Sequence, residues 1–472
     1  MNALRRVLVL SRVAALLPLV LVSDCDTDAP TAPVLRGAEA AAIGGPDPAV
    51  RSTVPSASPR DTSIAVQVLG SGFDRGTQAV WGLHGDTTVA TTKVHVGSTT
   101  FVSPHELIAE ITIDADATLD RYDVVAVTSK GKKGIGIELF AVTVNMTALP
   151  SLSDQGAGAT AINDAGTVAG AAWANDRPYA VRWTKRGRIW AIEKLPANTN
   201  DGLVAVPWDI AQDGTIVGVR FRLNVEDQAP RATVWPISGG IVDLGPGSAL
   251  GANAEGTIVG SRFEPNSGPQ GIQAVVWTRT AGRTWAPGQL LPRLPNGHAT
   301  EALGVNPAGT VIAGDAWDSD DVEYAVKWTL VGGQWRGPIR LDPVGETFAT
   351  LVNASGDIAG GGFPCGDRGA CQVQAMFWPA RGARVDVGTL GVFLSVNTPI
   401  GLSNSGEVVG LAFTPEFAEY AYLWRPTSAS IVNLGHLIGD ESSIATDING
   451  HHQVVGNSSG PGGAHAIVWT PR

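Results

Sequence analysis

The sequence predicts an all-β protein in which a small N-terminal β-sandwich precedes a seven-bladed β-propeller. Glycine and proline are abundant, at 58 and 30 residues, and charged residues make up only 16 % of the chain. That composition favours short strands joined by tight turns over long helices. Period-two apolar stretches mark the N-terminal part and a repeated unit fills the rest. At 472 residues the chain is long enough for two or more domains with separate cores.

The overall charge limits the kind of partner. The formal net charge is −11 and the isoelectric point is near 5.2. Binding to nucleic acid or to an anionic membrane surface needs a field of Lys and Arg side chains. We therefore expect no nucleic-acid partner, and a membrane contact only through a lipid anchor.

The N-terminus has the three parts of a secretion signal. Arg5 and Arg6 precede an apolar run at 13–22, which is too short to span a bilayer. The segment Leu21–Cys25 that ends this region resembles a bacterial lipobox, in which the cysteine becomes lipidated, although Asp24 replaces the usual small residue. We expect residues 1–25 to be a signal peptide that ends in lipidation of Cys25 or in simple secretion. Residues 26–48 have almost no large apolar side chain and predict a disordered tether.

Residues 49–147 predict a sandwich of about seven half-buried antiparallel strands. The alternation is clearest at 64–69, 107–113 and 122–128. Within this block, Gly70–Phe73, Phe101–Leu107 and Tyr122–Val124 resemble the IPT/TIG immunoglobulin-like family. The resemblance implies an immunoglobulin-like β-sandwich that serves as a spacer or adhesive module in a surface protein.

Residues 148–472 contain seven copies of one unit: an Asn-containing turn, a short apolar strand ending in Gly, a variable polar stretch, and an apolar strand ending in Trp. The glycines are Gly170, Gly218, Gly260, Gly314, Gly360, Gly410 and Gly456. The tryptophans are Trp183, Trp235, Trp277, Trp328, Trp378, Trp424 and Trp469. Successive tryptophans are 42 to 52 residues apart, which suits a four-stranded propeller blade.

Each part of the unit has a predicted structural role. The asparagines, as in Asn163–Gly166, cap type I turns, and the small residues beside each strand-ending Gly allow close packing of the inner strands. The tryptophans pack between neighbouring blades, and the alternative is an aromatic platform for sugars. The segment Ala148–Leu152 precedes the first copy and is expected to complete the last blade, which removes open sheet edges.

The repeat resembles the HAF family of bacterial extracellular repeats. The matching segments are Ala161–Asn163, Val454–Gly456, His465–Trp469 and Asp243–Gly245. The resemblance covers 148–472 and implies location and fold, because the family provides no catalytic residues to carry over.

Motifs of known chemistry are missing from the sequence. We expect no nucleophile elbow, and the sequence has no zinc-binding His-Glu-x-x-His and no phosphate loop. Cys365 and Cys371 lie in one loop and predict a local disulfide outside the cytosol, because no His flanks them to complete a metal site. His451 and His452 adjoin in a turn where the other copies have Asn-x-x-Gly, and a ligand role for the pair is the less favoured interpretation.

The candidate binding site lies on the loops between the Gly-ending and Trp-ending strands, which are the longest and least alike. Its candidate binding residues are Asp176, Asp227, Asp315, Asp318, Asp320, Asp321, Glu323 and Asp367. No cofactor is expected, although Asp318, Asp320 and Glu323 have a spacing somewhat like that of a calcium loop. Solvated acidic turns are the alternative interpretation.

The sequence favours a noncatalytic exported protein, lipid-anchored in the bacterial cell envelope or extracellular, whose propeller binds a protein or polysaccharide. The alternative is an extracellular glycoside hydrolase or polysaccharide lyase that uses acidic residues of the loops at 171–178, 219–230, 261–272, 315–323, 361–373, 411–418 and 457–463. A structural coat protein is a third interpretation. The enzyme would have a deep axial pocket lined by carboxylates with perturbed acidity.

Overall fold

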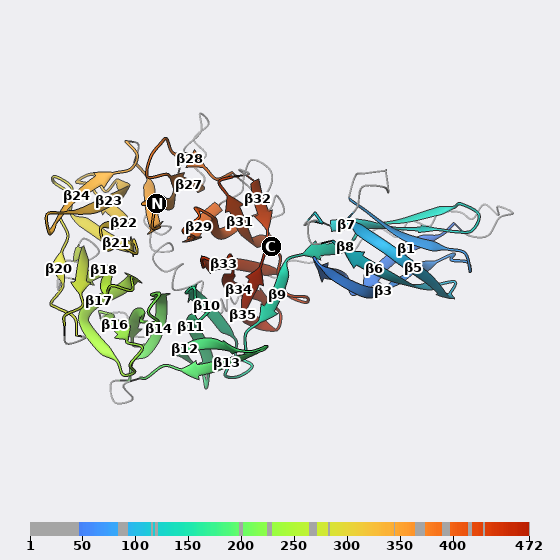
Figure 1. Ribbon diagram of the computed structural model, residues 1–472, viewed down its shortest axis with the longest axis horizontal. Coiled ribbons are helices and arrows are strands. Elements are labelled where there is room, and N and C mark those ends of the chain that lie inside the picture. Colours follow the sequence, from blue (N-terminus) through green and yellow to red (C-terminus); the bar gives the residue numbers. More distant parts are fainter. Residues whose placement is uncertain are drawn as a thin grey trace, which may run out of the picture. The chain divides into compact units, whose positions relative to one another are not determined.

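The computed structural model of the chain describes residues 47–83, 93–114, 117–118, 121–197, 202–223, 229–263, 271–281, 284–343, 345–363, 373–388, 397–413, 418–427 and 430–471. These residues form strands and no α-helix, which confirms the all-β prediction. Within these ranges no helix has the length and apolar character that a membrane span requires. The chain divides into a first unit that ends at Asn145 and a second from Met146 to Pro471 (Figure 1). The predicted signal peptide, Cys25 and nearly all of the predicted tether lie outside the described residues.

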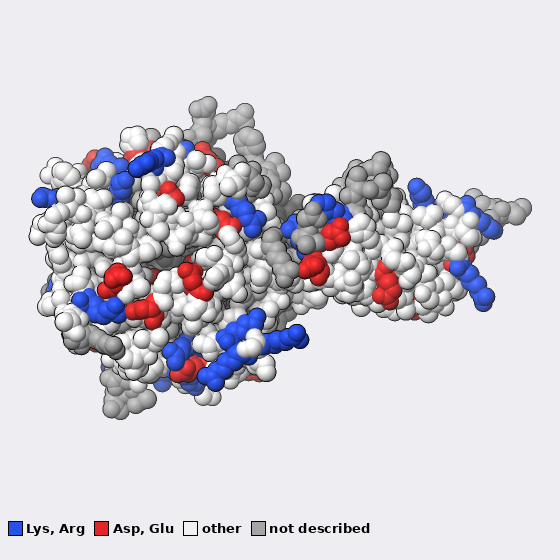
Figure 2. All heavy atoms as spheres, viewed as in Figure 1, with Lys and Arg blue, Asp and Glu red and all other residues white. Residues whose placement is uncertain are grey.

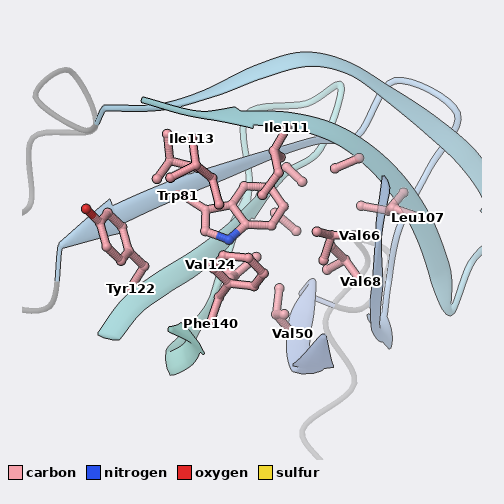
Figure 3. Close-up of a cluster of buried hydrophobic side chains, with 14 of the residues drawn as sticks. Val50, Val66, Val68, Trp81, Leu107, Ile111, Ile113, Tyr122, Val124 and Phe140 are labelled. Atoms are coloured by element: carbon pink, nitrogen blue, oxygen red, sulfur yellow. The ribbon is translucent and has the colours of Figure 1, made fainter. Parts of the chain in front are cut away.

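The first unit contains two four-stranded sheets. One has the order β1 (Ala49–Val54), β3 (Thr62–Ser71), β6 (Glu106–Ile113), β5 (Val94–Ser103). The other has the order β2 (Ala57–Pro59), β8 (Lys133–Thr143), β7 (Arg121–Val127), β4 (Gln78–Leu83). Side chains of both sheets meet in one core around Trp81, whose ring packs edge-on against Phe140 at 5.8 Å (Figure 3). Every second residue of β6 is buried, because one face of the strand packs on this core.

The second unit is a ring of antiparallel sheets (Figure 1). The first sheet contains β10 (Ala157–Ile162), β11 (Val168–Ala174), β12 (Arg177–Arg186) and β13 (Ile189–Lys194). A seven-stranded sheet follows, with β14 (Val204–Ile210), β15 (Ile216–Phe221), β16 (Arg231–Trp235), β17 (Val242–Ala252), β18 (Thr257–Phe263), β19 (Ile272–Thr278) and β20 (Gln289–Leu290). The long strand β17 pairs with β16 through its first half and with β18 through its second half, so two ladders share one strand.

Four further sheets complete the ring. The first two contain β21 (Ala299–Val305), β22 (Val311–Trp317), β23 (Glu323–Val331) and β24 (Gln334–Arg340), then β25 (Thr347–Val352), β26 (Ile358–Gly362), β27 (Gln374–Trp378) and β28 (Val385–Asp386). The last two contain β29 (Asn397–Leu402), β30 (Val408–Phe413), β31 (Glu419–Arg425) and β32 (Ser430–Asn433), then β33 (Ser442–Ile448), β34 (Val454–Gly460), β35 (Gly463–Thr470) and β9 (Asn145–Ala148).

The last sheet joins the two ends of the ring, because its outer strand β9 precedes the first sheet in sequence. The amide of Leu149, just after β9, donates to Ala466 O at 2.8 Å. The segment that leads into the first sheet therefore completes the last one, as expected, but the strand is Asn145–Ala148 and overlaps the predicted segment Ala148–Leu152 only at Ala148.

The strand-ending glycines are required by close approach of the first two strands of each ladder. At Gly456, a Cβ atom would overlap the carbonyl oxygen of Ile444 and press on Trp469. The same overlap with a facing carbonyl occurs at the corresponding glycine of every copy. Alanine in place of any of them would force neighbouring strands apart.

The turn asparagines connect neighbouring sheets as well as capping their own turns. In the first turn, Asn163 Oδ1 accepts the amide of Thr167 at 3.0 Å, as the capping role predicts, while its Nδ2 donates to Ala211 O at 3.3 Å in the next turn. Asn449 Nδ2 donates to Asn163 O at 3.0 Å, which links the last turn to the first. Asn253 and Asn353 make the same kind of bond to the following sheet. In these four turns the asparagine therefore bonds to the backbone of the neighbouring turn.

The seven repeat tryptophans are buried, with at most 6 % of their surface exposed. Trp183 lies in one cluster with Val455 and Val468, which belong to the last sheet, so it packs between neighbouring sheets. Three indoles donate Nε1–H to a proline carbonyl in the segment that enters their own sheet, at 2.7 to 2.9 Å: Trp183 to Pro150, Trp235 to Pro196 and Trp328 to Pro292. Rings buried in this way present no face to a sugar.

We expect Asn449→Ala to lower the free energy of unfolding by about 2 kcal/mol. It removes the bond to the first turn and leaves the amides of His451 and Gln453 without their side-chain acceptor. Calorimetry of the full chain measures the change. The control is Asn404→Ala, because Asn404 is exposed and its Oδ1 accepts only the amide of Ala354, so its loss should cost less than about 0.5 kcal/mol. Equal effects of the two substitutions would contradict the linking role of Asn449.

Candidate functional site

The described members of the predicted acidic set lie at one end of the sheets in the second unit. Asp176, Asp318, Asp320 and Asp321 are in loops, whereas Asp315 lies in strand β22 and Glu323 begins β23, so these two are not loop residues. Neighbouring strands within these sheets are antiparallel, so the loop after each second strand and the connection into each first strand share that end. We call this end the loop face; it includes the loops after β11, β15, β18, β22, β26, β30 and β34. Asp227, Asp367, Cys365 and Cys371 lie outside the described residues.

Asp318 shapes its own loop. Its Oδ1 accepts the amides of Asp320 and Val322, at 3.0 and 3.1 Å. Desolvation would raise the pKa of Asp318, but these bonds, the Tyr324 hydroxyl and the charge of Arg340 outweigh it and hold the pKa below its ordinary value. The carboxylate is therefore ionised and is used by the turn.

Two other predicted acids also bond to the scaffold. Asp315 is buried, and its Oδ1 accepts the amide of Ala349 in the next sheet at 2.7 Å. Asp176 Oδ1 accepts Gln155 Nε2 at 2.6 Å across the loop face. Asp315 thus connects two sheets, whereas Asp176 remains exposed at the surface.

The acids of the 315–323 segment do not converge on one point. Asp321 Oδ1 lies 3.1 Å from His298 Nε2, and Glu323 begins β23. No group of three His, Cys, Asp or Glu side chains that could hold a metal ion occurs in the described part of the chain, the set Asp318, Asp320 and Glu323 included.

The structure reveals a repeated position that sequence reasoning missed. It is the residue before the alanine of each Trp-ending strand, and we call it the paired position. Its occupants are Tyr179, Arg231, Gln273, Tyr324, Gln374, Tyr420 and His465. In six copies this side chain contacts a polar or charged partner: Lys194, Asp243, Arg293, Arg340, His436 and Asp440, respectively, with Gln374 outside this set. Aligning the repeats on one another would have revealed this position. Its partners differ in chemistry from copy to copy, so no shared contact could be predicted from the sequence.

The aromatic members of the paired position hold a ring against a basic group. Lys194 Nζ lies 3.7 Å from the centre of the Tyr179 ring, and Tyr420 stacks on His436 at 5.5 Å with an interplanar angle of 26°. Tyr179 and Tyr420 are partly exposed. Rings fixed by such contacts offer apolar edges beside hydrogen-bonding groups.

His465 is the occupant with the most organised surroundings. Its Nδ1 bonds to Asp440 Oδ2 at 3.1 Å, and Ser458 Oγ donates to the same oxygen at 2.5 Å. The Asp440 side chain is only 5 % exposed, whereas that of His465 is 42 % exposed. A buried carboxylate therefore orients an accessible imidazole, an arrangement that suits hydrogen bonding to a ligand or proton transfer.

Two further carboxyl groups lie in innermost strands. Asp209 Oδ2 accepts the amide of Ala252, and Asp447 Oδ2 accepts that of Ile162, both at 2.8 Å and both in the following ladder. Burial raises the pKa of Asp209 to about 6, and burial together with the charge of Asp209 raises that of Asp447 to about 8. Both residues could have been noticed in the sequence, because other copies of the repeat have Ala, Gly or Leu at this strand position. Carboxyl groups of raised pKa can exchange protons near neutrality.

His452 forms a link between two sheets. It takes the left-handed conformation (φ 59°) where other turns have Gly, and its Nδ1 bonds to Glu407 Oε2 at 2.5 Å. Arg425 Nε donates to Glu407 Oε1 at 2.9 Å, and Ser405 Oγ donates to Oε2 at 3.1 Å. Burial alone would raise the pKa of Glu407, but these partners hold it below its ordinary value. His452 thus has a structural partner within the chain.

The ring of antiparallel sheets, completed by β9, defines a β-propeller. No family model matches the chain, and no curated protein matches it. Among solved structures, the β-propeller domain of the Trilobed protease from Pyrococcus furiosus is 13 % identical, with a TM-score of 0.41 over 67 % of this chain and 96 % of that one. The Hadza microbial sialidase Hz136 is 12 % identical, with a TM-score of 0.35 over 90 % of this chain and 94 % of that one.

A sialidase from Trypanosoma rangeli is 11 % identical, with a TM-score of 0.35 over 73 % of this chain and 55 % of its own.

We expect Glu407→Gln to destabilise the chain by about 2 kcal/mol at pH 7, because it replaces a charged group that bonds to four side chains. The depressed pKa gives the pH dependence its sign. The stability that ionised Glu407 provides is fully present above the ordinary pKa of 4.5. It is lost as the pH falls through the lower pKa of this group in the folded state. The variant and the wild type should converge in strongly acidic buffer, as measured by denaturant unfolding.

The matched control is Glu255→Gln, which changes an exposed carboxylate in the corresponding turn before β18. Its effect should stay below about 0.5 kcal/mol at every pH. A Glu407→Gln effect that does not vary with pH would refute the ionic link.

Proposed function

We propose that this protein is a noncatalytic exported component of the bacterial envelope or cell surface, and that its propeller binds a polysaccharide or protein. In this proposal residues 1–25 direct export, with lipidation at Cys25, and residues 26–48 form a tether. An immunoglobulin-like domain of the IPT/TIG kind at 49–147 acts as a spacer. The propeller at 148–472 has seven blades of the HAF repeat type, with Cys365 and Cys371 joined in one loop.

The observation that carries the proposal is the paired position. It places a similar set of ring, amide, imidazole and cationic groups at the loop-face end of successive sheets. A repeating polymer can contact several such copies at once, and linked contacts multiply a weak single affinity. The contacts of Asp315 and Asp318 with backbone amides also support a scaffold role for the loop acids.

A second candidate function is a carbohydrate-active enzyme. The raised pKa values of Asp209 and Asp447 favour it, because a carboxylic acid that keeps its proton near neutrality can act as a general acid. Their bonds to backbone amides of the following ladder favour a structural role instead.

The test is a panel of polysaccharides presented to the full chain, with binding and release of reducing ends measured together. We expect saturable binding without turnover. Tyr179→Ala combined with Tyr420→Ala should weaken binding about tenfold, because each stacked aromatic contact contributes about 0.5 to 1.5 kcal/mol. Arg381→Gln, an exposed change on the opposite end of the sheets, is the control and should leave binding unchanged.

The outcomes separate the two candidate functions. Turnover that Asp209→Ala and Asp447→Ala abolish would replace the binding module with the enzyme. Binding to no polysaccharide in the panel would overturn the polysaccharide proposal in favour of a protein partner.

A further inference from the structure

The hairpin formed by β12 and β13 is strongly basic, although the protein as a whole is acidic. From 177 to 194 it has six cationic side chains and one acidic side chain, whereas the whole chain has a net charge of −11. The cations are Arg177, Arg182, Lys185, Arg186, Arg188 and Lys194. Figure 2 shows Lys and Arg side chains gathered over this part of the molecule. Glu193, the one acid, is bound to Arg182 at 2.9 Å.

The tip of the hairpin combines these cations with exposed apolar surface. Ile189 is 73 % exposed, directly after Arg188, and Lys185 and Arg186 are exposed on the opposite strand. Arg186 pairs in register with Ile189, and Lys185 pairs with Trp190. Lys185 Nζ lies 5.7 Å from the centre of the Trp190 ring. Arg186 and Arg188 therefore flank the exposed isoleucine, whereas Trp190 packs against the core of the first sheet beside Lys185.

Exposed aliphatic side chains also occur at the corresponding end of two other sheets. This end carries the asparagine turns and lies opposite the loop face. Ile237, in the turn between β16 and β17, is 63 % exposed and packs over the asparagine-type turn at Gly214. Val331, at the end of β23, is 57 % exposed. Exposed branched aliphatic side chains at hairpin tips are therefore a shared feature of this face.

We propose that the β12–β13 hairpin docks the propeller onto an anionic lipid bilayer. Lys185, Arg186 and Arg188 contact phosphate headgroups, and Ile189 enters the boundary between headgroups and acyl chains. Trp190 packs against the core of the first sheet and holds Lys185 beside its ring, at the base of this tip. This contact is independent of any lipid at Cys25 and leaves the loop face free for another ligand.

The cations of the hairpin require a partner with negative charge. The exposed Ile189 also requires that partner to have an apolar layer. A hydrated polyanion such as an acidic polysaccharide would pair with the cations and leave Ile189 in water. A bilayer satisfies both features, because it binds the cations through phosphate and takes the isoleucine into an apolar layer. The overall negative charge does not oppose docking, since fields beyond a Debye length of about 8 Å are screened at physiological salt.

The experiment is co-sedimentation of the full chain with phosphatidylcholine vesicles that contain none or about a third phosphatidylglycerol. The test variant is Lys185→Gln, Arg186→Gln, Arg188→Gln, and we expect it to lose about 100-fold in affinity for the anionic vesicles, from about 1 kcal/mol for each basic residue. Adding Ile189→Ser to the triple variant should weaken vesicle binding further. Ile189→Ser alone should weaken binding and leave the salt dependence of vesicle binding unchanged. All variants share residues 1–46, so differences between them report on the hairpin.

The matched control is Lys130→Gln, Lys132→Gln, Lys133→Gln, which removes the same charge from a hairpin turn of the first unit. It should bind the anionic vesicles like the wild type. Equal losses in the test variant and the control would overturn the proposal, because attraction would then follow net charge alone. Binding of the hairpin to an acidic polysaccharide but not to vesicles would also overturn it.

Discussion

The architecture of the second unit depends on how sheets that share no ladder are held to their neighbours. Four turn asparagines make such connections at the end of the sheets opposite the loop face. One oxygen caps the asparagine's own turn, and the amide nitrogen reaches the backbone of the next sheet. The bond from Asn449 to Asn163 spans 286 positions of sequence and joins the last turn to the first. The buried tryptophans supply apolar packing between the same sheets, so polar and apolar contacts act on one junction.

Much of this scaffold could be predicted from the repeat. The asparagine cap, the crowded glycine, the buried tryptophan and the completion of the last sheet by the segment before the first copy each have a local chemical reason. The bond from the asparagine Nδ2 to the next turn could not be predicted from the sequence, because its acceptor is a main-chain carbonyl in another copy. The acidic loop residues were ambiguous for a related reason. Asp318 caps a turn, and the same carboxylates at the same spacing could equally have met at an ion.

Departures from the repeat compensate one another across sheet boundaries. The turn before β30 has Ser403 in place of asparagine, and the turn before β34 has His452 in place of glycine. Glu407 connects these two irregular turns through the imidazole. A single repeat cannot show this relation, because the substitution in one copy gains its partner in the next. The paired position behaves in the same way. Its occupant is a ring, a guanidinium or an imidazole in different copies, and each contacts a partner of different chemistry.

The placement of β9 has a mechanical consequence. The covalent path from the first unit into the second runs through this strand, which is the outer strand of the sheet that joins the ring's two ends. A pulling force applied through the first unit is therefore carried first by the pairing of β9 with β35. If β9 were peeled away, the last sheet would retain β33, β34 and β35, and the ring would be held at that junction by side-chain contacts and the Asn449 bond. The junction between the first and last sheets is thus the place where tension would open the molecule.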